Sequence, residues 1–304
     1  MTKIVIVGAG IVGTATGTGL ADRGHSVQFV DIDDRRLRAL RAEGYTASDH
    51  LALPDEPTII FLTLPTANDG NRWDLTALQA GTRSVGIALA RSAGFHTVVT
   101  RSTVPPGTTE NAVRPILEEE SGLRTGTGFA LAANPAFLRA HSAYEDFVFP
   151  RTTVIASRSQ RTVERLRALL EPFGGEIVTF SRPAVAEMIK CSHNLFNAAK
   201  ISFWNEMWQV GQQLGLDTDE VAAAVAHSAE GSFNPTYGIH GGLPYSGGGL
   251  AAAAKGFLGF AAELGVETPF VQAIDAVNER MIALNIPDTI DVGETARPAE
   301  PSVA

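Results

Sequence analysis

The 304-residue sequence has a single cysteine and no long apolar run. The lone Cys191 cannot form a disulfide within the chain, which fits a reducing compartment. No apolar stretch approaches the roughly 18 residues that a membrane-spanning helix needs. The N-terminus also lacks the longer apolar segment and small-residue cleavage site of a signal peptide. We therefore expect a cytoplasmic protein with no membrane partner.

Positive charge is also scarce. The chain has 24 lysines and arginines against 33 aspartates and glutamates, and its net charge is −9. Nucleic acids bind to basic surfaces, so we expect no nucleic-acid partner, and we predict no metal site. The lysines are Lys3, Lys190, Lys200 and Lys255. A lysine at a candidate site therefore deserves more weight than an arginine.

Strand and helix patterns alternate through the first half of the chain. Short apolar segments predict strands at 3–7, 26–31, 58–63, 96–101, 129–132, 151–156 and 176–179. Amphipathic segments predict helices at 11–22, 34–43 and 161–172. This alternation indicates an α/β fold, a Rossmann doubly wound parallel sheet covered by helices on both faces.

The pattern becomes helical after Ser181. One long helix is predicted near 185–214, and shorter helices are predicted at 218–228, 250–264 and 270–284. The tail, rich in Pro, Glu and Ala, has the composition of a disordered segment. We therefore predict a Rossmann domain at 1–181, an all-helical substrate and dimerisation domain at 182–286, and a disordered tail at 287–304.

A glycine-rich turn links the first predicted strand to the first predicted helix. It reads Gly8-Ala9-Gly10-Ile11-Val12-Gly13. In a dinucleotide-binding unit, the first glycine permits the tight turn, the second lets the backbone approach a pyrophosphate, and the third lets helix and strand pack closely. The free N–H groups of the helix N-terminus then face the phosphates. The alternative is that these glycines only shape a strand–helix turn.

An acidic residue ends the second predicted strand. The Asp31 carboxylate can accept hydrogen bonds from both ribose hydroxyls of NAD, and it would repel the 2′-phosphate of NADP. Arg35 and Arg36 follow, and they can weaken that preference. We predict NAD as the cofactor, with Arg36 beside it.

Several separated motifs resemble one family, the nucleotide-sugar 6-dehydrogenases, over about residues 1–285. Besides the glycine loop they are Leu64-Pro65-Thr66, Ser102-Thr103-Val104-Pro105-Pro106-Gly107-Thr108, Asn134-Pro135-Ala136-Phe137-Leu138 and Glu187-Met188-Ile189-Lys190…Asn194…Lys200-Ile201…Asn205-Glu206. The resemblance implies NAD bound on a Rossmann domain and a homodimer formed through the long helix. It also implies that Leu64, Pro65 and Ser102 contact the cofactor, and that Thr103 lies near both cofactor and substrate.

The groups for the family's second oxidation are missing. Those enzymes oxidise an alcohol to an acid in two hydride transfers, and a cysteine traps the intermediate aldehyde. The matching position here is Gly249, or Leu250 after a one-residue shift. The family's Lys-Asp pair corresponds to Ala252-Ala253, and its two glutamates correspond to Ala136 and Ala140. We predict that acid formation through a thioester is not available, and that Cys191, turned about 100° from Lys190 on the helix, does not replace the cysteine.

Two residues of the long helix carry the predicted chemistry. Lys190 and Asn194 are four apart and share a helix face. A desolvated lysine has a lowered pKa and can take a proton from a substrate hydroxyl, while the asparagine holds the substrate oxygen. The competing interpretation is a surface lysine on an amphipathic helix. His141, His193 and His240 are candidates to replace the lost acids, although a structural role fits each of them better.

The leading hypothesis is an NAD-dependent oxidoreductase. It would perform one two-electron transfer between an alcohol and a carbonyl of a small molecule resembling a sugar, a sugar nucleotide or a nucleoside. The alternatives are a redox-neutral NAD-using epimerase and a degenerate NAD-binding protein. The family's further Rossmann-like domain does not occur in these 304 residues. The two-domain length resembles the β-hydroxyacid and 6-phosphogluconate dehydrogenases, which leaves the substrate class open.

Overall fold

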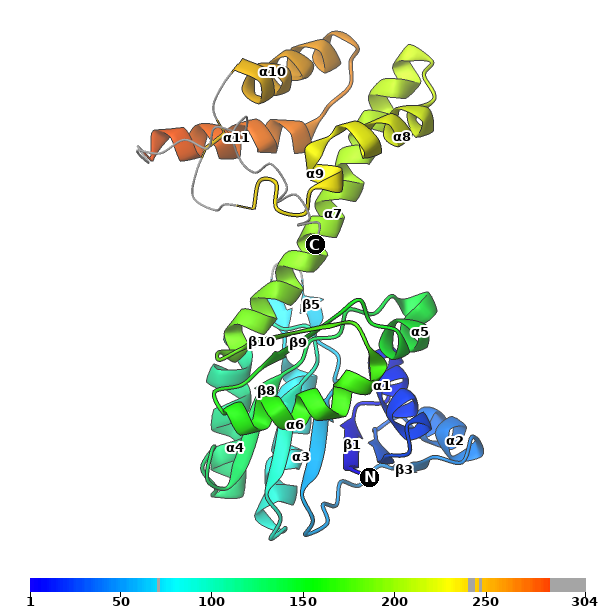
Figure 1. Cartoon of the computed structure of the whole chain (residues 1–304), viewed down its shortest axis with the longest axis vertical. Coiled ribbons are helices and arrows are strands. Elements are labelled where there is room, and N and C mark those ends of the chain that lie inside the picture. Colours follow the sequence, from blue (N-terminus) through cyan, green and yellow to red (C-terminus); the bar gives the residue numbers. More distant parts are fainter. Residues whose placement is uncertain (70–71, 240–243, 246–247, 285–304) are drawn as a thin grey trace, which may run out of the picture. The chain divides into compact units, whose positions relative to one another are not determined.

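The computed structural model describes residues 1–69, 72–239, 244–245 and 248–284. The chain divides into two compact units between Asn194 and Leu195, within one long helix. The first unit contains an eight-stranded sheet with helices on both faces, seen in Figure 1. The predicted tail at 287–304 and His240 lie outside the described residues.

The sheet has the strand order β10-β9-β8-β7-β4-β1-β2-β3. Its strands are β1 (Lys3–Val7), β2 (Ser26–Val30), β3 (Thr46–Ser48), β4 (Thr58–Leu62), β7 (His96–Thr100), β8 (Phe129–Ala133), β9 (Thr152–Ala156) and β10 (Glu176–Phe180). The chain order reverses on the two sides of β1, as in a doubly wound sheet. The predicted Rossmann fold is confirmed.

Two of the strands run against the others, which corrects the expectation of a wholly parallel sheet. β8 and β9 are antiparallel and pair only at Ala133 and Ala156, whereas β9 and β10 are parallel to each other. The connection from β8 to β9 contains a 3-10 turn and one short helix, α5 (Ala143–Val148). It brings β9 back beside β8 in the opposite direction.

Alternate residues of the central strands pack on opposite faces. On one face, Ile4 and Ile6 pack with α5 and with α1 (Ile11–Asp22), α2 (Asp34–Ala42) and α6 (Gln160–Leu170). On the other, Val5 and Val7 pack with α3 (Thr76–Ala90) and α4 (Arg114–Ser121). A strand buried on both faces reads as a continuous apolar run, which explains why the sequence pattern found these strands.

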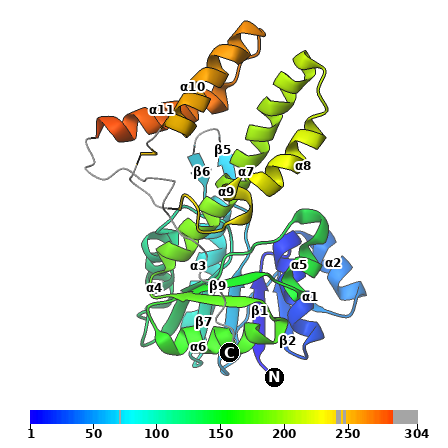
Figure 2. The same ribbon diagram turned by 45° about the horizontal axis from the view of Figure 1, so that its top comes forward.

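Helices make up most of the described part of the second unit. Here the second half of α7 (Pro183–Leu214) is followed by α8 (Thr218–Ser228), α9 (Glu230–Phe233), α10 (Gly248–Glu263) and α11 (Pro269–Ala283). Figure 2 shows α10 and α11 packed side by side. Glu206 on α7 is buried and accepts hydrogen bonds from the backbone N–H groups of Phe270 (2.5 Å) and Val271 (3.0 Å). It thereby caps the first turn of α11, which has no side-chain cap from Thr268.

Candidate functional site

The three glycines of the loop after β1 serve two different purposes. Gly8 has φ +102°, and a Cβ there would lie 2.7 Å from the Thr63 carbonyl oxygen. A Cβ at Gly13 would lie 1.8 Å from the Gly8 carbonyl oxygen. At Gly10 a Cβ would meet no atom within 4 Å. The fold therefore requires glycine at 8 and 13, whereas the open space at Gly10 fits a group that approaches from outside.

The helix that follows this loop leaves its first N–H groups available. Gly10 is the N-cap of α1 and provides no side-chain cap, and the first turn has no acidic residue. Ile11 is exposed there, and Val12 is half-buried. Free N–H groups and the positive end of the helix dipole suit a pyrophosphate. The loop and the helix start therefore fit the phosphates of a dinucleotide.

Asp31, directly after β2, is 8% exposed. One carboxylate oxygen accepts a hydrogen bond from the backbone N–H of Ala9 (2.6 Å) and a longer one from Arg36 (3.4 Å), and the other accepts from the N–H of Asp33 (2.8 Å). The oxygen that accepts from Asp33 keeps a second lone pair, so the carboxylate can still accept from a hydroxyl. Asp31 thus orders the glycine loop and lies where a ribose is expected.

The loops after β4 and β7 are joined at the same edge of the sheet. The Ser102 hydroxyl donates to the carbonyl of Leu64 (2.6 Å), and the Thr66 hydroxyl donates to the carbonyl of Thr103 (2.5 Å). Pro65 is exposed. Because the carboxyl ends of the parallel strands share this edge with the glycine loop, the structure brings Leu64, Pro65, Ser102 and Thr103 to the predicted cofactor edge.

A buried glutamate fixes the start of α7 against the loop after β7. The Glu187 carboxylate accepts from the backbone N–H groups of Gly107 (2.5 Å) and Thr109 (2.7 Å), and from the Thr109 hydroxyl (2.6 Å). One turn later, the Cys191 thiol donates to the Val104 carbonyl (3.4 Å). These contacts hold the helix turn that contains Lys190 beside the loop that begins at Ser102. Glu187 belongs to the motif that contains Lys190, but no sequence pattern predicted that its carboxylate would hold the loop after β7.

Lys190 is 8% exposed, and it forms no hydrogen bond or ion pair within the described residues. Its Nζ lies 5.3 Å from the centroid of the Phe137 ring, a cation–π contact. Burial, and then the positive charge of Arg101, lower the pKa of the Lys190 amine. The competing interpretation as a surface lysine is therefore wrong, and the side chain can change its protonation state closer to neutral pH.

Arg101 is a second buried cation near Lys190. Burial lowers the pKa of Arg101 to about 10. Its guanidinium donates to the Thr16 hydroxyl (2.9 Å) and to the side-chain and main-chain oxygens of Asn134. Arg101 has no carboxylate partner in the part of the chain that the structure describes. Ala136 lies two residues after Asn134 and is buried, so this position has a methyl group and no acid.

The other candidates from the sequence lie in different surroundings. Asn194, one turn after Lys190, is exposed. His193 packs edge-on against Phe137 (5.0 Å between ring centroids), and burial followed by the Lys190 charge lowers the pKa of its imidazole. His141 is exposed. Of the three histidines, His193 is thus the one that the described structure brings to the Lys190 neighbourhood.

The resemblance to the family predicts the cysteine's position at Gly249 or Leu250, at the beginning of α10. Gly249 and Leu250 lie in the first residues of this helix, and neither has a thiol. Burial, and then the Glu187 charge, raise the pKa of the Cys191 thiol, so Cys191 is also a poor thiolate.

Lys255 forms an ion pair with Glu279 (2.5 Å). Among the described helices, none is long and apolar enough to cross a bilayer.

Two models of one protein family match most of this chain. The NAD-binding-domain model of the UDP-glucose/GDP-mannose dehydrogenase family matches residues 2–51 and 44–174, and the central-domain model matches residues 184–280. The UDP-glucose 6-dehydrogenase AglM of Haloferax volcanii is 32% identical, over 93% of this chain and 71% of its own length. The GDP-mannose 6-dehydrogenase of Pseudomonas aeruginosa is 29% identical, over 92% of this chain and 69% of its own length.

A solved structure extends the agreement to three dimensions. The crystal structure of a ternary complex of GDP-mannose dehydrogenase from Pseudomonas aeruginosa superposes with a TM-score of 0.84 at 28% identity, over 93% of this chain and 69% of the other. The family places NAD on the Rossmann unit, and this agrees with the open approach at Gly10 and with the position of Asp31. The chain belongs to the UDP-glucose/GDP-mannose dehydrogenase family of NAD-dependent oxidoreductases that act on CH–OH groups.

Proposed function

We propose that this protein oxidises one alcohol of a sugar nucleotide to a carbonyl, or performs the reverse reduction, and does not continue to the acid. The observation that carries the proposal is the environment of Lys190, a buried amine with a lowered pKa and no carboxylate partner in the described residues. Such an amine can accept one proton. The epimerase and the degenerate NAD-binding protein are not favoured, because the family consists of NAD-dependent dehydrogenases.

The reaction releases one hydride and one proton from the substrate. The hydroxyl O–H proton moves to the neutral amine of Lys190, and the hydrogen of the carbinol C–H bond leaves with the bonding electron pair as a hydride. Bound NAD, held by the Gly8–Gly13 loop and Asp31, supplies the acceptor for that hydride. We assign Asn194 to the substrate oxygen and Thr103 to the edge between cofactor and substrate. The products are a carbonyl compound, NADH and one proton.

The missing side chains are the reason for a single oxidation. A second hydride transfer needs a tetrahedral carbon, which the family obtains by adding a thiolate to the aldehyde. Gly249 and Leu250 have no thiol, and Cys191 is a poorly ionised thiol on another helix. Ala136 and Ala140 have no acid to assist thioester chemistry. The second step therefore has neither its nucleophile nor its acids.

The experiment counts NADH formed per sugar nucleotide consumed, with UDP-glucose and GDP-mannose as the first substrates. We expect one NADH and one proton per substrate, and a carbonyl product that a hydrazine traps. Two NADH and an acid would refute the single oxidation. Absence of turnover with these and related sugars, nucleosides and hydroxy acids would refute the dehydrogenase. Lys190→Met is the matched inactive control, since it keeps the length of the side chain.

We also propose a homodimer formed through α7. After residue 194, this helix exposes large apolar side chains, namely Leu195 (69%), Phe196 (68%), Ile201 (62%) and Trp208 (54%). Exposed apolar groups in such number on one helix favour burial against a partner. Sedimentation should give twice the chain mass, and Phe196→Glu should halve it, whereas Ile282→Glu on α11 should not. A monomeric wild type would refute this assembly.

A cytoplasmic location stays a prediction, which cell fractionation tests.

A further inference from the structure

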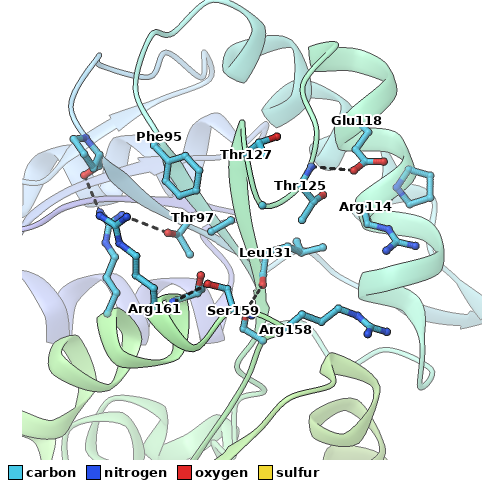
Figure 3. A pocket seen from close by; sticks show the side chains of 17 residues that line it. Phe95, Thr97, Arg114, Glu118, Thr125, Thr127, Leu131, Arg158, Ser159 and Arg161 are labelled. Atoms are coloured by element: carbon cyan, nitrogen blue, oxygen red, sulfur yellow. Dashed lines mark hydrogen bonds between the residues drawn. The ribbon is translucent and has the colours of Figure 1, made fainter.

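A second cavity lies at the edge of the sheet opposite the glycine loop. It has a volume of about 1150 Å³. Its lining includes Phe95 and Thr97, at the beginning of β7, and Ser159, at the beginning of α6 (Figure 3). The antiparallel pairing of β8 and β9 consists of a single pair, so the first part of β8 is paired with β7 on one side and has no paired strand on the β9 side. The cavity occupies this opening and is large enough for a nucleotide-sized ligand.

Four arginines and one glutamate are the charged residues of the lining. Arg158 forms an ion pair with Glu110 (2.5 Å), and Glu118 accepts from Arg124 (3.4 Å) and from the Thr125 N–H (2.9 Å). The lining therefore has a surplus of positive charge, in a chain whose net charge is −9. This local reversal of sign indicates a site for an anion.

The side chains of two of these arginines, Arg114 and Arg161, form no hydrogen bond or close ion pair within the described residues, and the Arg114 charge acts on the Glu118 carboxylate. Arg165, one turn after Arg161, donates to the Pro57 carbonyl (3.0 Å) and the Thr97 hydroxyl (3.4 Å). Burial, and then the charge of Arg161, lower the pKa of Arg165. An anion between these guanidinium groups would relieve their repulsion and supply the acceptor that they lack.

The remaining lining supplies both polar and apolar contacts. The Thr125 hydroxyl oxygen is buried and has no hydrogen-bond partner among the residues that the structure describes. Ser159 is the N-cap of the 11-residue helix α6, whose N-terminus adds positive potential. Phe95 is 40% exposed and Leu131 is buried, and they form an apolar part of the lining. Cationic groups beside an apolar wall match a molecule that has both a phosphate and an organic ring.

We propose that this cavity is a second ligand site, distinct from the NAD and substrate site, and that it binds a phosphate-bearing small molecule of nucleotide size. The phosphate contacts Arg161 beside Arg165, and the organic part packs on Phe95. Arg114, on the opposite side of the cavity, adds positive potential (Figure 3). The test is calorimetric titration of the full chain, saturated with NAD so that the glycine loop is occupied. The probes are inorganic pyrophosphate, which has the charge alone, and uridine 5′-monophosphate, which adds a ring.

We expect both probes to bind, and Arg161→Ala to weaken both by about tenfold, the loss of one charge-assisted hydrogen bond. Arg114→Ala should weaken both by a smaller factor, because it removes only long-range attraction. Phe95→Ala should weaken only the nucleotide. Arg167→Ala, on the same helix but outside the cavity, is the matched control and should change neither. Thermal unfolding verifies that the variants fold. Absence of binding to the NAD-saturated protein, or an equal loss in Arg167→Ala, would overturn the proposal.

Discussion

The contrast between Gly10 and Gly13 allows the cofactor contact to be separated from the fold by two matched substitutions. Gly10 has φ −75° and ψ −169°, a backbone conformation that alanine adopts freely. Gly10→Ala lowers the conformational entropy of the unfolded chain, worth about 0.4–1 kcal/mol in favour of folding. Alanine is also a poorer N-cap than glycine, by a similar amount. The free energy of unfolding should therefore change by less than about 0.5 kcal/mol.

Gly13→Ala should behave in the opposite way. Its Cβ would lie 1.8 Å from the Gly8 carbonyl oxygen, so the backbone must move. Overpacking of this kind costs about 3 kcal/mol at the upper end of its usual range, and the helix propensity of alanine returns about 1 kcal/mol. For a unit of this size, the remaining loss of about 2 kcal/mol lowers Tm by about 4–8 °C.

The assay combines thermal unfolding of the two apo variants with NAD titration followed by protein fluorescence. Gly10→Ala should keep the wild-type Tm and bind NAD at least about tenfold more weakly, a loss of about 1.4 kcal/mol. Gly13→Ala should lose several degrees of Tm. Equal Tm losses in the two variants, or unchanged NAD affinity in Gly10→Ala, would refute the assignment of Gly10 to the pyrophosphate.

Three further predictions concern the Lys190 neighbourhood. The wild-type rate should rise with pH as the Lys190 amine loses its proton. The midpoint should lie below the ordinary lysine pKa, because burial and the charge of Arg101 lower the pKa of this amine. The side chain in Lys190→Arg stays protonated, so kcat should fall about 100-fold or more while NAD affinity is unchanged. Ala136→Glu adds a carboxylate that raises the Lys190 pKa, so the midpoint of the pH–rate profile should move up, and an unmoved midpoint would contradict the proximity of position 136. Glu187→Gln replaces a charged acceptor of three hydrogen bonds and places an amide against N–H donors. The free energy of unfolding in a denaturant titration should therefore fall by about 2 kcal/mol. An unchanged unfolding midpoint would show that this carboxylate does not hold the start of α7.

The sequence predicted most strands of the sheet because their residues pack in two apolar layers, one on each face. It did not predict α3, whose pattern is interrupted by Gly81 and Gly86. Both are small because neighbours approach closely: a Cβ would lie 2.2 Å from a Leu64 methyl carbon at Gly81 and 2.6 Å from the Glu120 Cβ at Gly86. The reversed direction of β9 was also missed, because a strand's local pattern is the same in either direction.

The candidate site was predicted unevenly for a similar reason. Glycine spacing and an acid after β2 are local signals, so Gly8, Gly10, Gly13 and Asp31 could be identified from the sequence. The environment of Lys190 is made by Phe137, which is more than 50 residues earlier in the chain, and single-sequence patterns contain no such contact. The resemblance to a family supplied these distant residues as motifs, but the structure was needed to show which of them lie together.

The alanine at position 136 links the two chemical proposals for Lys190. Burying two cations near one another is costly, and an adjacent acid is the usual compensation. Here Ala136 is buried, and Glu187, one turn from Lys190, is already bonded to three donors of the loop after β7. Arginine keeps its proton under these conditions, so the lysine is the group that can relieve the repulsion by losing one. The same loss of an acid therefore favours a neutral Lys190, a base for the first oxidation, and removes the assistance that thioester chemistry would need.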